Sequence, residues 1–131
     1  MNNIKFSHYT TEYINGVMSL RTPQKRSLEI LADIVNEIKL KNRNKDLITA
    51  LSDIRNKYPT CTDFEKDFIS LTFALATGVG KTRLMGAFIS YLYTRYNIKN
   101  FFVVAPNSTI YEKLKKDLGE PGHPKYVFKG L

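Results

Sequence analysis

The stretch from Phe68 to Tyr96 constrains the fold of this chain more than any other part of the sequence. It begins with FISLTFALA at 68–76, a short and mostly apolar run that predicts a buried strand. A glycine-bearing turn follows, and from Lys81 the apolar residues recur at helical spacing. Glycines let the backbone approach an anion closely, and the start of a helix offers N–H groups to it. The sequence therefore predicts a strand, a turn and a helix that together bind phosphate.

The segment LATGVGKT at 75–82 nearly matches the phosphate-binding P-loop pattern G-x-x-x-x-G-K-[ST]. Leu75 replaces the first glycine, but Gly78 stands in the middle of the loop. Lys81 is predicted to reach the β- and γ-phosphates as a catalytic residue, and the Thr82 hydroxyl is predicted to bind Mg²⁺. The predicted nucleotide-binding residues of this loop are Thr77, Gly78, Val79, Gly80, Lys81, Thr82 and Arg83. The alternative is a fortuitous glycine-rich turn with an exposed lysine.

Two further apolar segments follow the predicted P-loop helix. FFVVA at 101–105 predicts a second buried strand, and Tyr126 to Phe128 predicts the start of a third. Between them, Asn107 or Ser108 is expected to cap a helix that ends near Gly119. This alternation of strands and helices predicts an α/β fold with a parallel βαβαβ sheet.

The N-terminal part of the sequence predicts helices. Residues 1–21 have no clear periodicity, but Thr22 and Pro23 are typical of a helix start, and apolar residues then recur to Leu40. A polar link, KNRNK at 41–45, precedes a second short helix that is expected near 47–54. We therefore divide the chain into an N-terminal helical segment, 1–66, and the start of a nucleotide-binding lobe that contains the P-loop, 67–131.

The composition narrows the class of protein. A formal charge of +8 favours an anionic partner such as nucleic acid, although lysine-rich solvated helix faces would give the same charge. Cys61 is the only cysteine, and His8 and His123 have no metal-ligand spacing, so we expect neither a disulfide nor a zinc site. No apolar run is long enough to cross a bilayer, and the N-terminus is no secretory signal. These features predict a cytoplasmic protein with no membrane association and a reduced thiol.

Nucleotide hydrolysis requires acidic residues that the predicted strand ends do not supply. In most P-loop enzymes, an Asp at a strand end holds Mg²⁺ and a Glu orients the attacking water. After Lys81 the carboxylates are Glu112, Asp117 and Glu120, all in or just after a predicted helix. We therefore predict that this polypeptide alone binds nucleotide weakly and does not hydrolyse it.

Three segments resemble motifs of superfamily-two helicases and translocases. LATGVGKT is similar to motif I of that superfamily, and LRTPQ at 20–24 is similar to its glutamine motif, in which Gln24 matches the residue that reads adenine. FFVVAPNSTIYEKL at 101–114 resembles motif Ia, whose residues touch a nucleic-acid backbone. The matching positions for DNA contact are Pro106, Asn107, Ser108 and Thr109.

From about Leu20 to Leu131 the sequence closely resembles the start of the res subunit of type III restriction-modification enzymes. The resemblance implies a RecA-like lobe that binds ATP and Mg²⁺. It also implies ATP-dependent translocation on double-stranded DNA coupled to cleavage, with a modification methyltransferase subunit as partner. Another superfamily-two helicase, or a stand-alone or inactive P-loop module, remains the alternative.

The sequence departs from that family because it has no DExx-type acidic motif, second motor lobe or nuclease residues. We expect either an incomplete part of a longer protein or a decayed remnant. The interrupted third strand favours the incomplete part.

Overall fold

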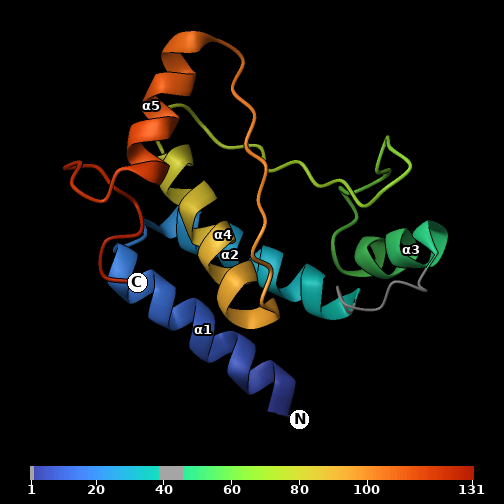
Figure 1. Cartoon of the computed structure of the whole chain (residues 1–131). Helices are drawn as coiled ribbons and strands as arrows, with labels where there is room; N and C mark the ends of the chain where they lie inside the picture. Colours follow the sequence, from blue (N-terminus) through green and yellow to red (C-terminus); the bar gives the residue numbers. More distant parts are fainter. Residues whose placement is uncertain (1, 39–45) are drawn as a thin grey trace.

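The computed structural model describes residues 2–38 and 46–131, and this part of the chain forms five helices (Figure 1). The first, second and fourth helices lie together, the third lies to one side near the end of the second, and the fifth lies near the N-terminal end of the fourth. The helices are α1 (Asn2–Met18), α2 (Thr22–Glu37), α3 (Leu47–Lys57), α4 (Lys81–Tyr96) and α5 (Ser108–Gly119).

The predicted parallel sheet is wrong, since no residue among 2–38 and 46–131 lies in a strand. The segments 68–76 and 101–105 are irregular connections, and residues 126–128 lie next to or within turns. An apolar run becomes a strand only when its backbone pairs with a neighbouring strand. None of the backbone hydrogen bonds described outside the helices joins these segments. The predicted RecA-like βαβαβ lobe is therefore wrong for the fold of this chain.

The main core lies between α1, α2 and α4. Its largest fully buried side chain is Tyr91 of α4, which packs among Ile14 and Met18 of α1 and Leu28 of α2. Val127 packs on the same core from the C-terminal segment. A Cβ at Gly86 would lie 2.7 Å from Cγ2 of Val127, so this glycine lets the C-terminal segment approach α4.

Helix α1 was not expected from the sequence because its buried stripe is partly polar. The buried residues recur at helical spacing, but the three on the N-terminal side carry hydroxyls. Thr10 and Thr11 donate to backbone carbonyls of the preceding turn, at 2.8 Å each, which satisfies their hydroxyls inside the helix packing. The buried stripe consists of Ser7, Thr10, Thr11, Ile14 and Met18.

The predicted helices near 47–54, 81–96 and 108–119 are confirmed as α3, α4 and α5. Asn107 caps α5, because its side chain accepts a hydrogen bond of 3.0 Å from the Ile110 N–H. The expected cap of α2 was wrong by one residue, since Thr22 is already helical and Arg21 is the N-cap. Helix α2 ends at Glu37. The last predicted apolar position of this helix, Leu40, and the whole of the predicted polar link 41–45 lie outside the described residues.

A second, smaller apolar cluster joins α3 to α2. Ile34 of α2 and Ile38, the residue that caps its C-terminal end, pack against Ala50 and Ile54 of α3, and Phe64 completes the cluster. No helix in the described part of the chain is long and apolar enough to span a membrane.

Candidate functional site

The predicted P-loop forms a tight turn directly before α4. Gly78 has a φ of 81° and Gly80 has a φ of 88°, both in the left-handed region that L side chains rarely adopt. Gly80 is the N-cap of α4 and has no side chain with which to cap the first N–H groups of the helix. The start of α4 is therefore an uncapped helix N-terminus, which is the arrangement that binds phosphate in proteins.

A cavity of about 510 Å³ lies against this turn. Six of the seven predicted P-loop residues line one side of it, and α5 with the segment after it lines the other. Val79 is not among the lining residues. The Arg83 guanidinium donates to the carbonyl of Met18, which ties the first turn of α4 to the end of α1. The six are Thr77, Gly78, Gly80, Lys81, Thr82 and Arg83.

Gln24 lies against the P-loop, and its side chain is 2% exposed. Its Nε2 donates to the Gly80 carbonyl at 2.9 Å, and its Oε1 accepts from the Arg21 N–H at 2.8 Å. The Arg21 guanidinium also lies 3.4 Å from the Gly78 carbonyl. The start of α2 therefore holds the backbone of the P-loop at two points, a contact that no spacing in the sequence predicts. The predicted contact of Gln24 with adenine stays a prediction.

The four predicted DNA-contact positions lie at the start of α5, on the surface. Pro106, Asn107, Ser108 and Thr109 are all exposed, and none of them lines the P-loop cavity. The side-chain oxygen Oδ1 of Asn107 accepts the capping hydrogen bond, which leaves its side-chain nitrogen Nδ2 and the hydroxyls of Ser108 and Thr109 as donors. Lysines of the same helix add positive charge nearby, at positions 113, 115 and 116. The arrangement suits contact with phosphates, and the contact itself stays a prediction.

The lining of the P-loop cavity fits a nucleotide with its Mg²⁺. Lys81 and Thr82 supply a cation and a hydroxyl at the uncapped start of α4. A pre-formed metal cage is absent from the described residues, which contain no group of three His, Cys, Asp or Glu side chains able to hold an ion. The predicted contact of Thr82 with a nucleotide-bound Mg²⁺ stays a prediction.

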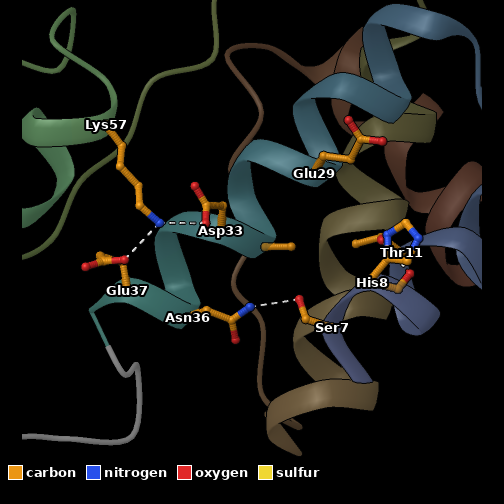
Figure 2. Close-up of a pocket in the computed structure, with 9 residues that line it drawn as sticks. Ser7, His8, Thr11, Glu29, Asp33, Asn36, Glu37 and Lys57 are labelled. Atoms are coloured by element: carbon orange, nitrogen blue, oxygen red, sulfur yellow. Dashed lines mark hydrogen bonds and ion pairs between the residues drawn. The ribbon is translucent and has the colours of Figure 1, made fainter. Parts of the chain in front are cut away.

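A second cavity, of about 370 Å³, lies between α1 and α2 (Figure 2). Three acidic side chains of α2 line it, but Lys57 lies 3.0 Å from Asp33 Oδ1 and 2.9 Å from Glu37 Oε2. These two contacts raise the pKa of Lys57 to about 12, and the contact with Glu37 has the larger effect. Lys57 of α3 thus pairs with two of the three carboxylates, and these ion pairs join α3 to α2.

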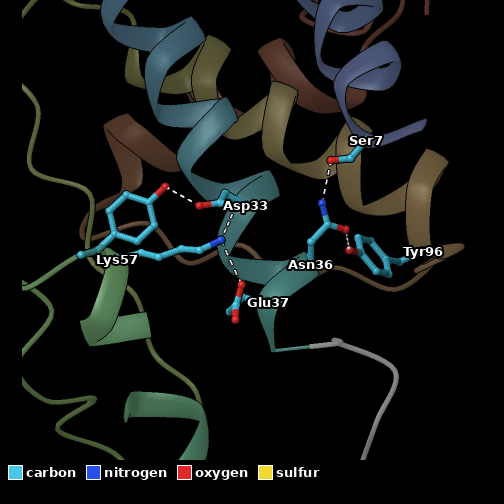
Figure 3. A network of polar contacts seen from close by, with 7 residues as sticks. Ser7, Asp33, Asn36, Glu37, Lys57 and Tyr96 are labelled. Carbon is cyan, nitrogen blue, oxygen red and sulfur yellow. Dashed lines mark hydrogen bonds and ion pairs between the residues drawn. The ribbon is translucent and has the colours of Figure 1, made fainter. Parts of the chain in front are cut away.

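The hydrogen bonds beside this cavity join three helices (Figure 3). Asn36 of α2 donates to Ser7 Oγ at 2.8 Å and accepts from the Tyr96 hydroxyl at 2.7 Å. Ser7 of α1 lies 2.6 Å from the buried hydroxyl of Tyr91. Burial raises the pKa of both tyrosines, and that of Tyr96 reaches about 12. This network stabilises the packing of α1, α2 and α4, on which the position of the P-loop depends.

Comparison with known proteins identifies the family. The family model described as type III restriction enzyme, res subunit, matches residues 17–130. The matched range includes Gln24, the P-loop and the start of α5. A search of curated proteins found no match, and a search of solved structures also found none. The chain therefore belongs to the family of the type III restriction enzyme res subunit, whose members are helicase-like, ATP-dependent proteins that act on DNA.

Proposed function

We propose that this chain is the ATP-binding part of a type III restriction-like DNA translocase and endonuclease subunit. The observation that carries the proposal is the P-loop turn, in which two glycines with positive φ precede the uncapped N-terminus of α4. The family match supports ATP as the nucleotide, because the family uses ATP with Mg²⁺. Backbone N–H groups from Gly78 to Thr82 and the Lys81 ammonium bind the phosphates in this proposal.

Thr82 holds Mg²⁺ on the phosphates in the same proposal. The bound ion would neutralise charge on the β- and γ-phosphate oxygens and so polarise the terminal phosphate. The chain's own contribution is to place Lys81 and Thr82 on the first turn of a helix whose position is fixed by Gln24 and Arg83. Binding of nucleotide therefore depends on Gln24 and Met18, which are distant in sequence from the P-loop.

Gln24 has two roles in this proposal. It holds the Gly80 carbonyl in the present structure, and it reads the adenine base, as the resemblance of LRTPQ implies. An amide has a second N–H and a second lone pair left after its two internal hydrogen bonds. Because the side chain is only 2% exposed, contact with adenine requires α2 and the P-loop to separate locally. Nucleotide binding and the packing of α2 are therefore coupled.

Double-stranded DNA is the proposed macromolecular ligand, and the start of α5 is its proposed contact. The four exposed positions 106–109 and the net charge of +8 support an electrostatic interaction with phosphates. Translocation, site-specific DNA cleavage and association with a modification methyltransferase subunit are the family activities to which the proposal extends.

A nucleotide-binding module without hydrolysis is the second candidate function. Among the described residues, Asp117 is the only carboxylate that lines the P-loop cavity, and it is engaged by Lys113 and His123. A carboxylate in such contacts is poorly placed to orient a water for attack on phosphate. We propose that this polypeptide by itself binds ATP and does not turn it over.

Titration calorimetry with Mg²⁺ and ATP tests the nucleotide site. We expect Lys81→Ala to lose at least tenfold in affinity, because it removes a charge-assisted contact worth about 1.5–3 kcal/mol. Lys99→Ala is the matched control, since Lys99 is exposed and does not line the cavity. Circular dichroism should show the same helix content in all three proteins. If Lys81→Ala binds ATP as well as the wild type does, the site assignment is wrong.

A further inference from the structure

The wall of the P-loop cavity that faces α4 comes from α5 and the segment after it. The resemblance to motif Ia covers part of α5 but assigns roles only to positions 106–109, which do not line the cavity. Lys113 of α5 extends toward the P-loop, so that its Nζ lies 3.4 Å from Thr82 Oγ1. Lys125 lines the same wall. Of the described side chains that line the cavity, four are cationic and one, Asp117, is a carboxylate. Such a cavity attracts a polyanion.

Asp117 fixes this wall. Its side chain is only 6% exposed, and its carboxylate lies 3.8 Å from Lys113 Nζ and 3.5 Å from His123 Nδ1. Its backbone carbonyl accepts a hydrogen bond of 2.9 Å from the Val127 N–H, and Val127 packs on α4 at Gly86. Asp117 therefore links the lysine to the same core that positions the P-loop.

Lys113 combines a fixed location with freedom to turn. Its side chain is 58% exposed, and its ammonium has three N–H donors. A pair between positions i and i+4 on a helix, such as Lys113 and Asp117, is common on protein surfaces. That pairing alone does not require the lysine to reach the Thr82 hydroxyl across the cavity, which it does here.

We propose that Lys113 is a second phosphate-binding residue of the nucleotide site, positioned by Asp117. This inference rests on the proposed function, because it assumes that a nucleoside triphosphate binds at the P-loop. Lys113 contacts the residue predicted to hold Mg²⁺ near the terminal phosphates, so it favours a triphosphate over a diphosphate. When Thr82 engages the ion, the ammonium turns from the hydroxyl to a terminal phosphate oxygen.

Lys113→Met tests the proposal in the full chain, with calorimetric titration of ATP and of ADP in the presence of Mg²⁺. We expect the dissociation constant for ATP to rise about tenfold, the size of one charge-assisted hydrogen bond, and that for ADP to rise less than about threefold. Lys113→Arg should restore most of the preference for ATP because it retains the charge. Unchanged affinity for both nucleotides in Lys113→Met would overturn the assignment.

Lys115→Met is the matched control for net charge. Lys115 lies on the same helix and is exposed, but it does not line the cavity. We expect it to change the affinity for ATP by less than about twofold, as for a screened surface charge. If Lys113→Met and Lys115→Met lose the same affinity for ATP, the loss follows from the change in net charge, which would contradict the proposal.

Lys81→Ala separates failure of this inference from failure of the proposed function. If Lys81→Ala binds ATP like the wild type, the P-loop site is wrong and the role of Lys113 falls with it. If Lys81→Ala loses ATP and Lys113→Met retains it, the inference about Lys113 alone is wrong. The role of Asp117 is read from a double-mutant cycle, in which Lys113→Met should matter less in an Asp117→Asn background. Full additivity of the two substitutions would exclude Asp117 as the positioning residue.

Discussion

At the residue scale, Gly80 meets two demands at once. Its φ of 88° lies in the left-handed region, and a Cβ there would lie 2.5 Å from the Gln24 Nε2 atom. The pattern around Gly80 could be predicted to bind phosphate because it is local in sequence. The closeness of Gln24 could not be predicted, since positions 24 and 80 meet only after α2 and α4 have packed on each other.

Gly80→Ala is expected to lower both stability and nucleotide affinity. The left-handed conformation costs an L residue about 1–2 kcal/mol, and displacement of the Gln24 amide costs a further 1–3 kcal/mol or so. Denaturant unfolding and ATP titration measure the two effects. Gly122→Ala is the control, because an added Cβ at Gly122 would meet nothing within 4 Å. Equal stability of the two variants would contradict this account of Gly80.

Substitution of Gln24 separates its two proposed roles. Gln24→Leu keeps the volume but leaves the Arg21 N–H and the Gly80 carbonyl without their partner, so we expect a loss of about 2 kcal/mol in the free energy of unfolding. We also expect the affinity for ATP to fall more than that for GTP. Loss of the contact with Gly80 affects both nucleotides, whereas loss of the contact with adenine affects ATP alone. A parallel loss for ATP and GTP would restrict Gln24 to holding the P-loop.

At the scale of elements, the sequence predicts what is determined locally. Helices α3, α4 and α5 have apolar residues at helical spacing, and Asn107 supplies a cap to α5, so these helices could be predicted. Helix α1 could not, because hydroxyl side chains occupy part of its buried stripe. The segments 68–76 and 101–105 are apolar enough for strands, but strand formation depends on a partner that local sequence does not specify.

Asn107 offers a way to separate helix capping from DNA contact. Asn107→Ala removes the hydrogen bond to the Ile110 N–H and should destabilise α5 by about 1 kcal/mol. Asn107→Asp keeps the cap, so its stability should match the wild type, but the added negative charge should weaken DNA binding several-fold. Thermal unfolding and fluorescence anisotropy with duplex DNA measure the two quantities.

The control for Asn107→Asp is Asn56→Asp, which adds the same charge at an exposed position of α3. It should leave DNA affinity within about twofold of the wild type at physiological salt. If both variants weaken DNA binding equally, the start of α5 is not a specific contact and the effect belongs to net charge.

At the scale of the whole molecule, the predicted boundary between residues 66 and 67 does not coincide with a gap in the packing. Helices α1 and α2 precede the boundary and α4 follows it, yet all three share one core. The division stays a prediction about domains. The hydrogen bonds among Ser7, Asn36 and Tyr96 show why the arrangement could not be read from sequence, because each partner is distant along the chain and ordinary by itself.

The same network predicts how the whole fold responds to alkaline pH. Burial raises the pKa of Tyr91, and it raises that of Tyr96 from 10.0 to about 12. A tyrosine whose pKa is higher in the folded state than in the unfolded state contributes its full stability below pH 10. That contribution is lost as the pH rises from about 10 toward 12, since the unfolded chain releases its protons first.

We therefore expect the melting temperature to fall steeply above pH 10, and the fall to be shallower in Tyr96→Phe, which removes one of the titrating hydroxyls. At neutral pH, Tyr96→Phe should cost about 1 kcal/mol, because Asn36 loses a hydrogen bond. Tyr93→Phe is the control, since Tyr93 is 55% exposed. Tyrosinate absorbance recorded during the same pH titration follows the ionisation directly. If the melting temperature depends on pH in the same way in Tyr96→Phe and Tyr93→Phe, ionisation of the buried Tyr96 is not the cause of the loss of stability at alkaline pH.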